Sequence, residues 1–119
     1  MRESPIAFNT VLELCGAEHR RIILAVLATE QRPLTVNDLR RTILKYNHHT
    51  PVTDASEEVL TGIRASLHHA HIPKLESAGV INYDTERQLV EPREQFDQLQ
   101  PHLSAILGTD PNLNEPIKL

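Results

Sequence analysis

Apolar residues recur at helical spacing in the first quarter of the chain and predict two helices there. The first covers residues 7–14 and stops before Gly16, since glycine commonly terminates a helix. The second covers residues 17–29, where apolar positions follow an i, i+1, i+4, i+5 pattern along one face. Glu18 lies in its first turn, where the helix dipole favours an acid.

The next segment predicts a short extended stretch followed by a third helix. Residues 34–36 could form one short extended segment of a β-sheet. Either Thr35 or Asn37 can cap a helix running to about residue 46. Polar residues and a proline then predict a loop over residues 47–55. The face of the third helix opposite its apolar positions carries three basic side chains: Arg40, Arg41 and Lys45.

A long helix is predicted over residues 56–78, with Ser56 as its cap and two glutamates in its first turn. Pro73 has no N–H to donate to the carbonyl of His69, so a kink is expected near residues 69–72. Gly79 is expected to terminate the helix.

The remaining pattern predicts a β-hairpin and a last helix. Residues 80–83 and 88–91 alternate as short strands around a turn at 84–87. A helix over residues 93–107 follows, which Pro101 could split, and the tail from Gly108 is expected to be frayed and flexible. Four apolar residues of this helix follow a heptad-like 3-4-3 spacing: Phe96, Leu99, Leu103 and Ile106.

Composition limits the class of protein. The 119 residues suit one domain, and with 3% aromatic residues and no Trp the core must consist of Leu, Ile, Val and Ala. Cys15 is the only cysteine, which fits a reduced cytoplasm, and the apolar run at 22–28 is too short to span a membrane. No phosphate-binding glycine loop or nucleophile motif is present, so neither an enzyme nor a cofactor is expected.

Charge is distributed unevenly along the chain. The net charge is −4, which is unusual for a nucleic-acid-binding domain. Residues 1–54 nevertheless hold seven Lys and Arg against six acids, whereas residues 55–119 hold five against ten. Any basic surface should therefore come mainly from the first half of the chain.

The element order, with a hairpin directly after a helix ending in Ala-Gly-Val-Ile, is the layout of a winged helix-turn-helix: mainly α with a small β-hairpin. The run "HIPKLESAGVINYD", together with "RRIILAVL", "LTVNDLRRTI" and "TPVTDASEEV", resembles a family of small winged-helix domains abundant in haloarchaea. The resemblance covers residues 12–89. It implies archaeal transcription regulators, mostly of unassigned target, that bind double-stranded DNA.

On this winged-helix interpretation, residues 1–91 form the winged domain and residues 92–119 form a C-terminal helix and tail. Helix 56–78 becomes the recognition helix, and its outward residues are expected in the major groove: Thr61, Arg64, His68 and His69. Five basic residues are candidates for phosphate contacts: Arg40, Arg41, Lys45, Lys74 and Arg87. The alternative for all of them is an ordinary solvated surface.

Other interpretations of the same residues stay open. His68 and His71 share a helical face and could bind a metal with Cys15, His19, His48 or His49, or His71 could be a buried histidine bonded to a carbonyl. Arg20 or Arg21 could pair with a glutamate or cap a neighbouring helix end. A winged helix can also be a protein-interaction module, which acids near the basic residues, from Glu57, Glu58 or Glu76, would favour.

The heptad residues of the last helix suggest either core packing or a homodimer seam. Winged helices commonly dimerise so that two half-sites are bound one helical turn apart. Phe96, Leu99, Leu103 and Ile106 are therefore candidates for dimerisation through the terminal helices.

Overall fold

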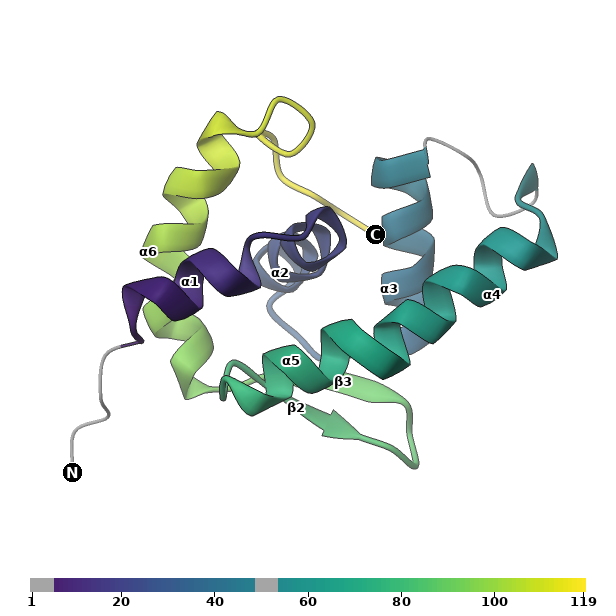
Figure 1. The fold of residues 1–119 in the computed structure, drawn as a ribbon, viewed down its shortest axis with the longest axis horizontal. Coiled ribbons are helices and arrows are strands. Elements are labelled where there is room, and N and C mark those ends of the chain that lie inside the picture. The colour runs from purple at the N-terminus through teal and green to yellow at the C-terminus, as the bar shows by residue number, and fades with distance from the viewer. Residues whose placement is uncertain (1–5, 49–53) are drawn as a thin grey trace.

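A computed structural model describes residues 6–48 and 54–119, except for the side chain of His48. Two N-terminal helices, α1 (Phe8–Leu14) and α2 (Glu18–Glu30), lead into strand β1 (Leu34–Thr35) and helix α3 (Val36–Ile43) (Figure 1). A π-helical segment, η1 (Leu44–His48), extends α3 beyond its predicted end. The predicted loop at 47–55 therefore begins later than expected, and most of it lies outside the described residues.

Helix α2 is the centre of the hydrophobic core. Its residues 22–27 are all buried, so that apolar side chains cover almost its whole circumference. Helix α3 contributes Val36, Leu39 and Ile43 from one face, and the strands contribute Leu34 and Val90. As expected from the composition, aliphatic side chains form most of this core; the one buried aromatic residue among those described is Phe96.

A capping box fixes the start of α3. The Thr35 hydroxyl accepts a hydrogen bond from the Asp38 N–H at 3.0 Å, and the Asp38 carboxylate accepts one from the Thr35 N–H at 3.1 Å. Each interaction satisfies a donor that would otherwise be unpaired at the end of the helix. Of the two predicted caps, Thr35 is therefore the one used, and β1 passes into α3 without a loop.

The long helix predicted over residues 56–78 is present in three consecutive segments. They are α4 (Glu57–Ser66), a π-helical turn η3 (Leu67–His71) and α5 (Ile72–Ser77), with Ser56 as the cap. The Ile72 N–H donates to the carbonyl of Leu67, five residues earlier. This wide turn lies directly before Pro73, at the place where the missing proline N–H predicts an irregular helix.

Gly79 ends this long helix, as predicted. Its φ of 78° is left-handed, a conformation that glycine adopts without strain. The Val80 N–H then reaches back to the Leu75 carbonyl and the Gly79 N–H to the Glu76 carbonyl, which is the pattern of a Schellman motif. The chain thereby turns directly into the first strand of the hairpin.

Strands β2 (Ile81–Asp84) and β3 (Leu89–Pro92) form the predicted hairpin, and β1 pairs with the outer side of β3. The sheet is antiparallel with strand order β1-β3-β2. The hairpin turn has neither Gly nor Asn, and Asp84 stabilises it instead. The Asp84 carboxylate accepts hydrogen bonds from the N–H groups of Glu86 and Arg87.

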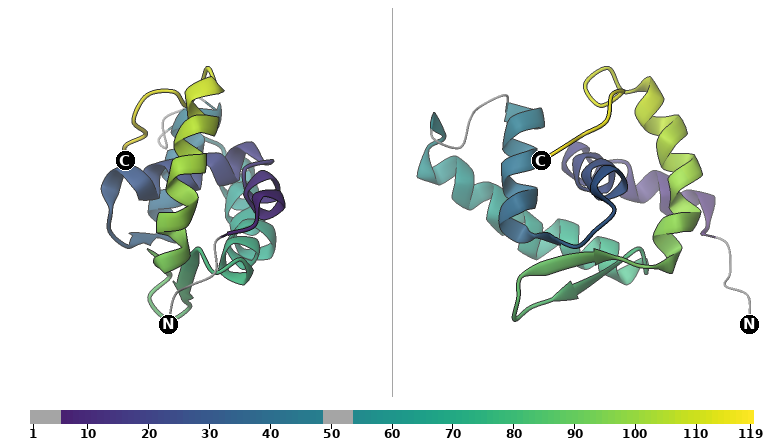
Figure 2. Two further views of the ribbon diagram at one scale, coloured as in Figure 1. Left: turned by 90° about the vertical axis from the view of Figure 1, so that its left-hand side faces the viewer. Right: turned by 180° about the vertical axis from the view of Figure 1, so that it is seen from behind.

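Helix α6 (Glu94–Thr109) remains continuous through Pro101 and packs against α2 and α1 (Figure 2). The expectation of a frayed tail needs correction. Leu113 and Ile117 are buried, the Lys118 N–H donates to the Tyr46 hydroxyl, and the Leu119 N–H donates to Glu30. The C-terminal residues thus cross back over α2 toward η1, because two apolar side chains of the tail fill the core.

The protein is mainly helical with a small three-stranded antiparallel sheet. Its element order is compatible with the predicted winged helix-turn-helix. Among the described residues, no helix combines the length and apolar character needed to cross a lipid bilayer.

Candidate functional site

The outer face of α4 and η3 carries the candidate site. Residues 59–75 contain no Asp or Glu, although the whole chain has sixteen acids. Arg64 and His69 are exposed here among small or uncharged side chains, namely Thr61, Gly62, Ala65 and Ala70. Small neighbours leave the backbone of the helix open to close approach by a large ligand. Acids return at both ends of the face, with exposed Glu57, Glu58 and Glu76.

Gln88 connects this helix face to the hairpin. Arg64 Nη2 lies 3.4 Å from Gln88 Oε1, and Gln88 Nε2 donates to the Thr85 carbonyl at 2.9 Å. The Gln88 carbonyl in turn accepts the N–H of Val36, the first residue of α3. One residue therefore links the hairpin to both α3 and α4. Sequence reasoning did not identify Gln88, because a polar residue at the end of a turn has no distinguishing signal.

His68 is only partly available on this face. It is half-buried, and its ring meets Tyr83 of β2 edge-to-face with centroids 6.1 Å apart. Burial and the nearby Arg64 guanidinium lower the pKa of His68, so the ring stays neutral to lower pH than a solvated histidine. Burial likewise raises the pKa of Tyr83. Of the two histidines predicted to point outward, His69 is the more exposed.

His71 points to the opposite side of the helix, toward α2. The Arg20 Nη1 atom lies 3.2 Å from His71 Nδ1, and the His19 ring lies 5.6 Å away between centroids. Burial, followed by the charges of Arg20 and His19, lowers the pKa of His71 to about 4. The prediction of a mostly buried histidine fits, but the partner is a guanidinium and not the expected backbone carbonyl.

Arg20 and Arg21 resolve one of the open alternatives. Arg20 donates to the carbonyls of Glu13 and Leu14, and Arg21 donates to the carbonyl of Cys15. Both guanidinium groups thus bind carbonyls at the C-terminal end of α1, which is the predicted capping of a neighbouring helix. Arg21 also pairs with Asp110, 3.1 Å away, and so ties the tail to α2.

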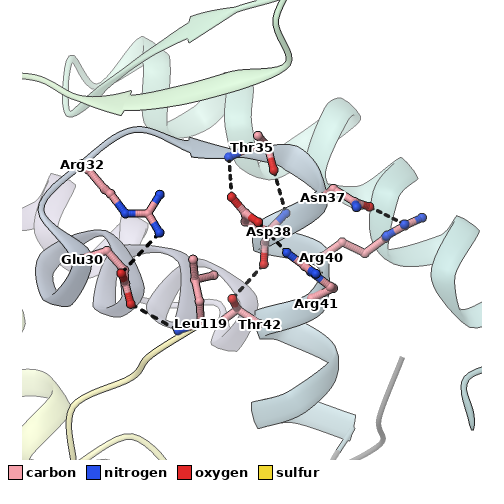
Figure 3. Close-up of polar contacts among 9 residues, drawn as sticks. All are labelled: Glu30, Arg32, Thr35, Asn37, Asp38, Arg40, Arg41, Thr42 and Leu119. Carbon is pink, nitrogen blue, oxygen red and sulfur yellow. Dashed lines mark hydrogen bonds and ion pairs between the residues drawn. The ribbon is translucent and has the colours of Figure 1, made fainter. Parts of the chain in front are cut away.

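The three basic residues predicted on the third helix differ in their contacts. Arg40 hydrogen-bonds the side chain of Asn37, and Arg41 forms an ion pair with Asp38 at 2.7 Å (Figure 3). Burial alone would raise the pKa of Asp38, but hydrogen bonds from the Thr35 N–H and the Arg41 guanidinium outweigh it and lower this pKa. Lys45 is exposed, with its Nζ 5.1 Å from the centre of the Tyr46 ring. All three basic groups are at the surface or near it.

The remaining two candidates for phosphate contacts are paired with acids. Lys74 Nζ lies 2.7 Å from Glu13 Oε1, and Arg87 Nε lies 3.8 Å from Asp84 Oδ2. Lys74 therefore connects α5 to α1, and its hydrogen bond and charge lower the pKa of Glu13. Both side chains are partly or well exposed, so these ion pairs can exchange for other anions at little cost.

A metal site at the histidine cluster finds no support in the geometry. His68 and His71 diverge to β2 and α2, respectively, and Arg20 places a positive charge beside His71. Within residues 6–48 and 54–119, no three side chains from His, Cys, Asp and Glu come together as metal ligands. His49 and the side chain of His48 lie outside the described residues. Cys15 is buried, which raises the pKa of its thiol.

The predicted dimer residues lie mainly in the core of the single chain. Phe96, Leu99 and Leu103 have at most 2% of their surface exposed, and Ile106 packs against the same core. Three of the four side chains are thus unavailable to a second chain, which corrects their assignment as a dimer surface. The heptad spacing reflects the packing of α6 on α1 and α2.

Comparison with known proteins identifies a family. The model of a family described as "Domain of unknown function (DUF7344)" matches residues 12–91, which run from α1 to the end of the hairpin. No curated protein and no solved structure matches this chain.

Proposed function

Because the chain belongs to the DUF7344 family, to which no function is assigned, we propose a function from the geometry of the site. The proposal is a sequence-specific transcription regulator that binds double-stranded DNA through a winged helix-turn-helix. Helix α3 would be the supporting helix, α4 to α5 the recognition helix, and the β2–β3 hairpin the wing. This proposed function requires neither a catalytic residue nor a cofactor.

The single observation that carries this proposal is the acid-free outer face of α4 and η3. A helix that enters the major groove must bring its backbone close to bases and avoid negative charge near the phosphates. The exposed small residues Gly62, Ala65 and Ala70 meet the first requirement. The absence of Asp and Glu between residues 59 and 75 meets the second. A helix face that contacts only water would require neither small side chains nor the absence of acids.

Arg64 has the strongest base-reading potential on this face. A guanidinium can donate two hydrogen bonds to O6 and N7 of guanine, and this is the commonest specific contact in the major groove. Its weak contact with Gln88, at 3.4 Å, orients the side chain and is easily exchanged for a base. Thr61 and His69 lie on the same exposed surface and can reach a base edge or a phosphate.

Phosphate contacts would come from the cations around this face. Arg40, Arg41 and Lys45 lie on α3 and η1, the elements preceding α4, whereas Arg87 lies at the tip of the hairpin. Arg41 and Arg87 must each leave an ion pair before they can bind a phosphate. With a net charge of −4, the expected non-specific affinity is therefore modest.

Selection of bound sequences from a random duplex pool tests this proposal. We expect the intact protein to enrich a motif containing guanine. Arg64→Ala should weaken binding to that motif by about 10- to 100-fold and relax the preference at one position. Arg93→Ala is the matched control, because it removes the same charge from an exposed site at the start of α6.

Failure of enrichment, with no retention of DNA at low salt, would rule out the DNA-binding proposal. The second candidate would then be a protein-interaction module built on the same fold. The observation favouring it is that acids interrupt the basic surface: Glu13 pairs with Lys74, Asp84 pairs with Arg87, and Glu57 and Glu58 are exposed.

In the DNA-binding experiment, equal losses of DNA affinity with Arg64→Ala and Arg93→Ala would show that Arg64 contributes only charge.

A further inference from the structure

Helix α1 exposes two large apolar side chains on one face. Phe8 is 62% exposed and Leu12 is 49% exposed, and the two side chains lie one helical turn apart. The opposite face of the helix is buried through Val11 and Leu14. These two side chains therefore leave a substantial apolar area in contact with water, which is unfavourable. This exposed face of α1 is therefore a candidate contact surface.

Helix α6 extends the same surface. The Phe8 ring lies edge-to-face with the exposed ring of His102, with centroids 6.2 Å apart. Gln98 and Ala105 neighbour His102 at helical spacing along α6. We define the α1–α6 patch as Phe8, Asn9, Leu12, Gln98, His102 and Ala105. None of these six residues is Asp, Glu, Lys or Arg, and the nearby Glu13 carboxylate is paired with Lys74. The exposed acids Glu94 and Asp97 lie beside Gln98, at the edge of the patch.

We propose that the α1–α6 patch binds a second copy of this chain. In a two-fold symmetric dimer, residues near the axis face their own counterparts, so any formal charge there meets the same charge. A patch without formal charge avoids this repulsion, although the chain as a whole carries a net charge of −4. A partner that carried strong charge would instead find no opposite charge within the patch.

The position of the patch is compatible with the use of α4 by another ligand. Helices α1 and α6 lie together near one end of the long axis of the molecule, and α4 extends toward the other (Figures 1 and 2). Pairing two copies through the α1–α6 patch therefore leaves both α4 faces open. The inference does not depend on DNA binding, because the dimer can be measured with the protein alone.

Sedimentation velocity of the full chain over a wide concentration range tests this proposal. We expect the wild-type protein to pass from monomer to dimer as its concentration rises. The double variant Phe8→Ser, Leu12→Ser should weaken dimerisation by more than about tenfold, because two central apolar contacts are lost. Val59→Ser is the matched control, since Val59 is an exposed apolar residue on α4, outside the patch.

Circular dichroism should confirm that the variants are folded. If the α1 double variant does not fold, His102→Asp tests the same patch from α6, where an added like charge should also favour the monomer. A wild-type chain that stays monomeric at every concentration would overturn the proposal, even if Phe8 and Leu12 bound another protein. Undiminished dimerisation in a folded patch variant would overturn it as well.

Discussion

At the scale of single residues, His71 shows how one contact makes stability depend on pH. Its ring accepts a hydrogen bond from Arg20 at 3.2 Å only while Nδ1 is unprotonated. Protonation would place a positive charge beside a guanidinium, within a partly buried site. The fold therefore favours neutral His71, and its pKa falls to about 4 from 6.5.

We expect the free energy of unfolding to decrease as the pH falls from 6.5 toward 4. The unfolded chain binds a proton on His71 in this range and the folded chain does not, so stability is fully present above pH 6.5. The loss should be about 1–2 kcal/mol, after allowance for partial solvation. Urea denaturation at a series of pH values measures it. His71→Gln, which cannot titrate, should flatten the pH dependence.

The matched control for this prediction is His69→Gln, which removes an exposed histidine from the same helical turn. It should retain the wild-type pH dependence. His68 also has a lowered pKa and contributes in the same direction, so His71→Gln should reduce the slope without abolishing it. If His71→Gln and His69→Gln behaved alike, the proposed link between Arg20 and His71 would be wrong.

The helical face on which a side chain lies was predictable from the sequence, but the residue that it contacts was not. Helical spacing placed His71 on the core side because it follows Leu67 by four residues. Its partner Arg20 lies 51 residues earlier, and no periodicity encodes that contact. For the same reason, the spacing that singled out Arg64 could not indicate Gln88, whose position depends on the hairpin packing beside α4.

At the scale of elements, two glycines of the long helix should respond in opposite ways to alanine. Gly79 has a φ of 78°, so Gly79→Ala should destabilise the protein by about 1–2 kcal/mol. Gly62 lies inside α4, with open space for 4 Å around the point where an alanine methyl group would lie. Gly62→Ala should therefore stabilise the protein by about 0.5–1 kcal/mol. Thermal unfolding monitored by circular dichroism distinguishes the two.

Each of these glycine variants serves as a control for the other, since both add one methyl group. Destabilisation by both would show that the exposed face of α4 is not free of tertiary constraint. Equal stability of Gly79→Ala and the wild type would mean that the turn from α5 into β2 does not require a left-handed residue. The first result would also weaken the view that α4 is open to a large ligand.

Most elements were predictable because local chemistry decides where they begin and end. Thr35, Ser56 and Gly79 fix helix boundaries within a few residues of sequence, so the predicted limits differ from the observed ones by only a few positions. The course of the tail was not predictable in this way. Leu113 and Ile117 are isolated apolar residues in a polar segment, and their burial depends on a surface of the assembled core.

At the scale of the whole molecule, the two proposed surfaces should cooperate in DNA binding. A dimer formed through the α1–α6 patch carries two α4 faces, and it also carries two sets of Arg40, Arg41 and Lys45. If these three residues and Arg87 contact phosphates, one copy should release about four counterions and a dimer about twice that number. Doubling the contacts would compensate for the net charge of −4 on each chain.

The slope of log affinity against log salt concentration measures this cooperation. With an enriched DNA site, we expect a slope of about −7 for the wild type and about −4 for Phe8→Ser, Leu12→Ser, since each phosphate contact contributes about −0.9. Arg41→Ala should reduce the wild-type slope by about two units because both copies lose a contact, whereas Arg93→Ala should leave it unchanged. Equal slopes for the wild type and the patch variant would mean that dimerisation does not add phosphate contacts. An unchanged slope in Arg41→Ala would mean that Arg41 does not contact a phosphate in the complex.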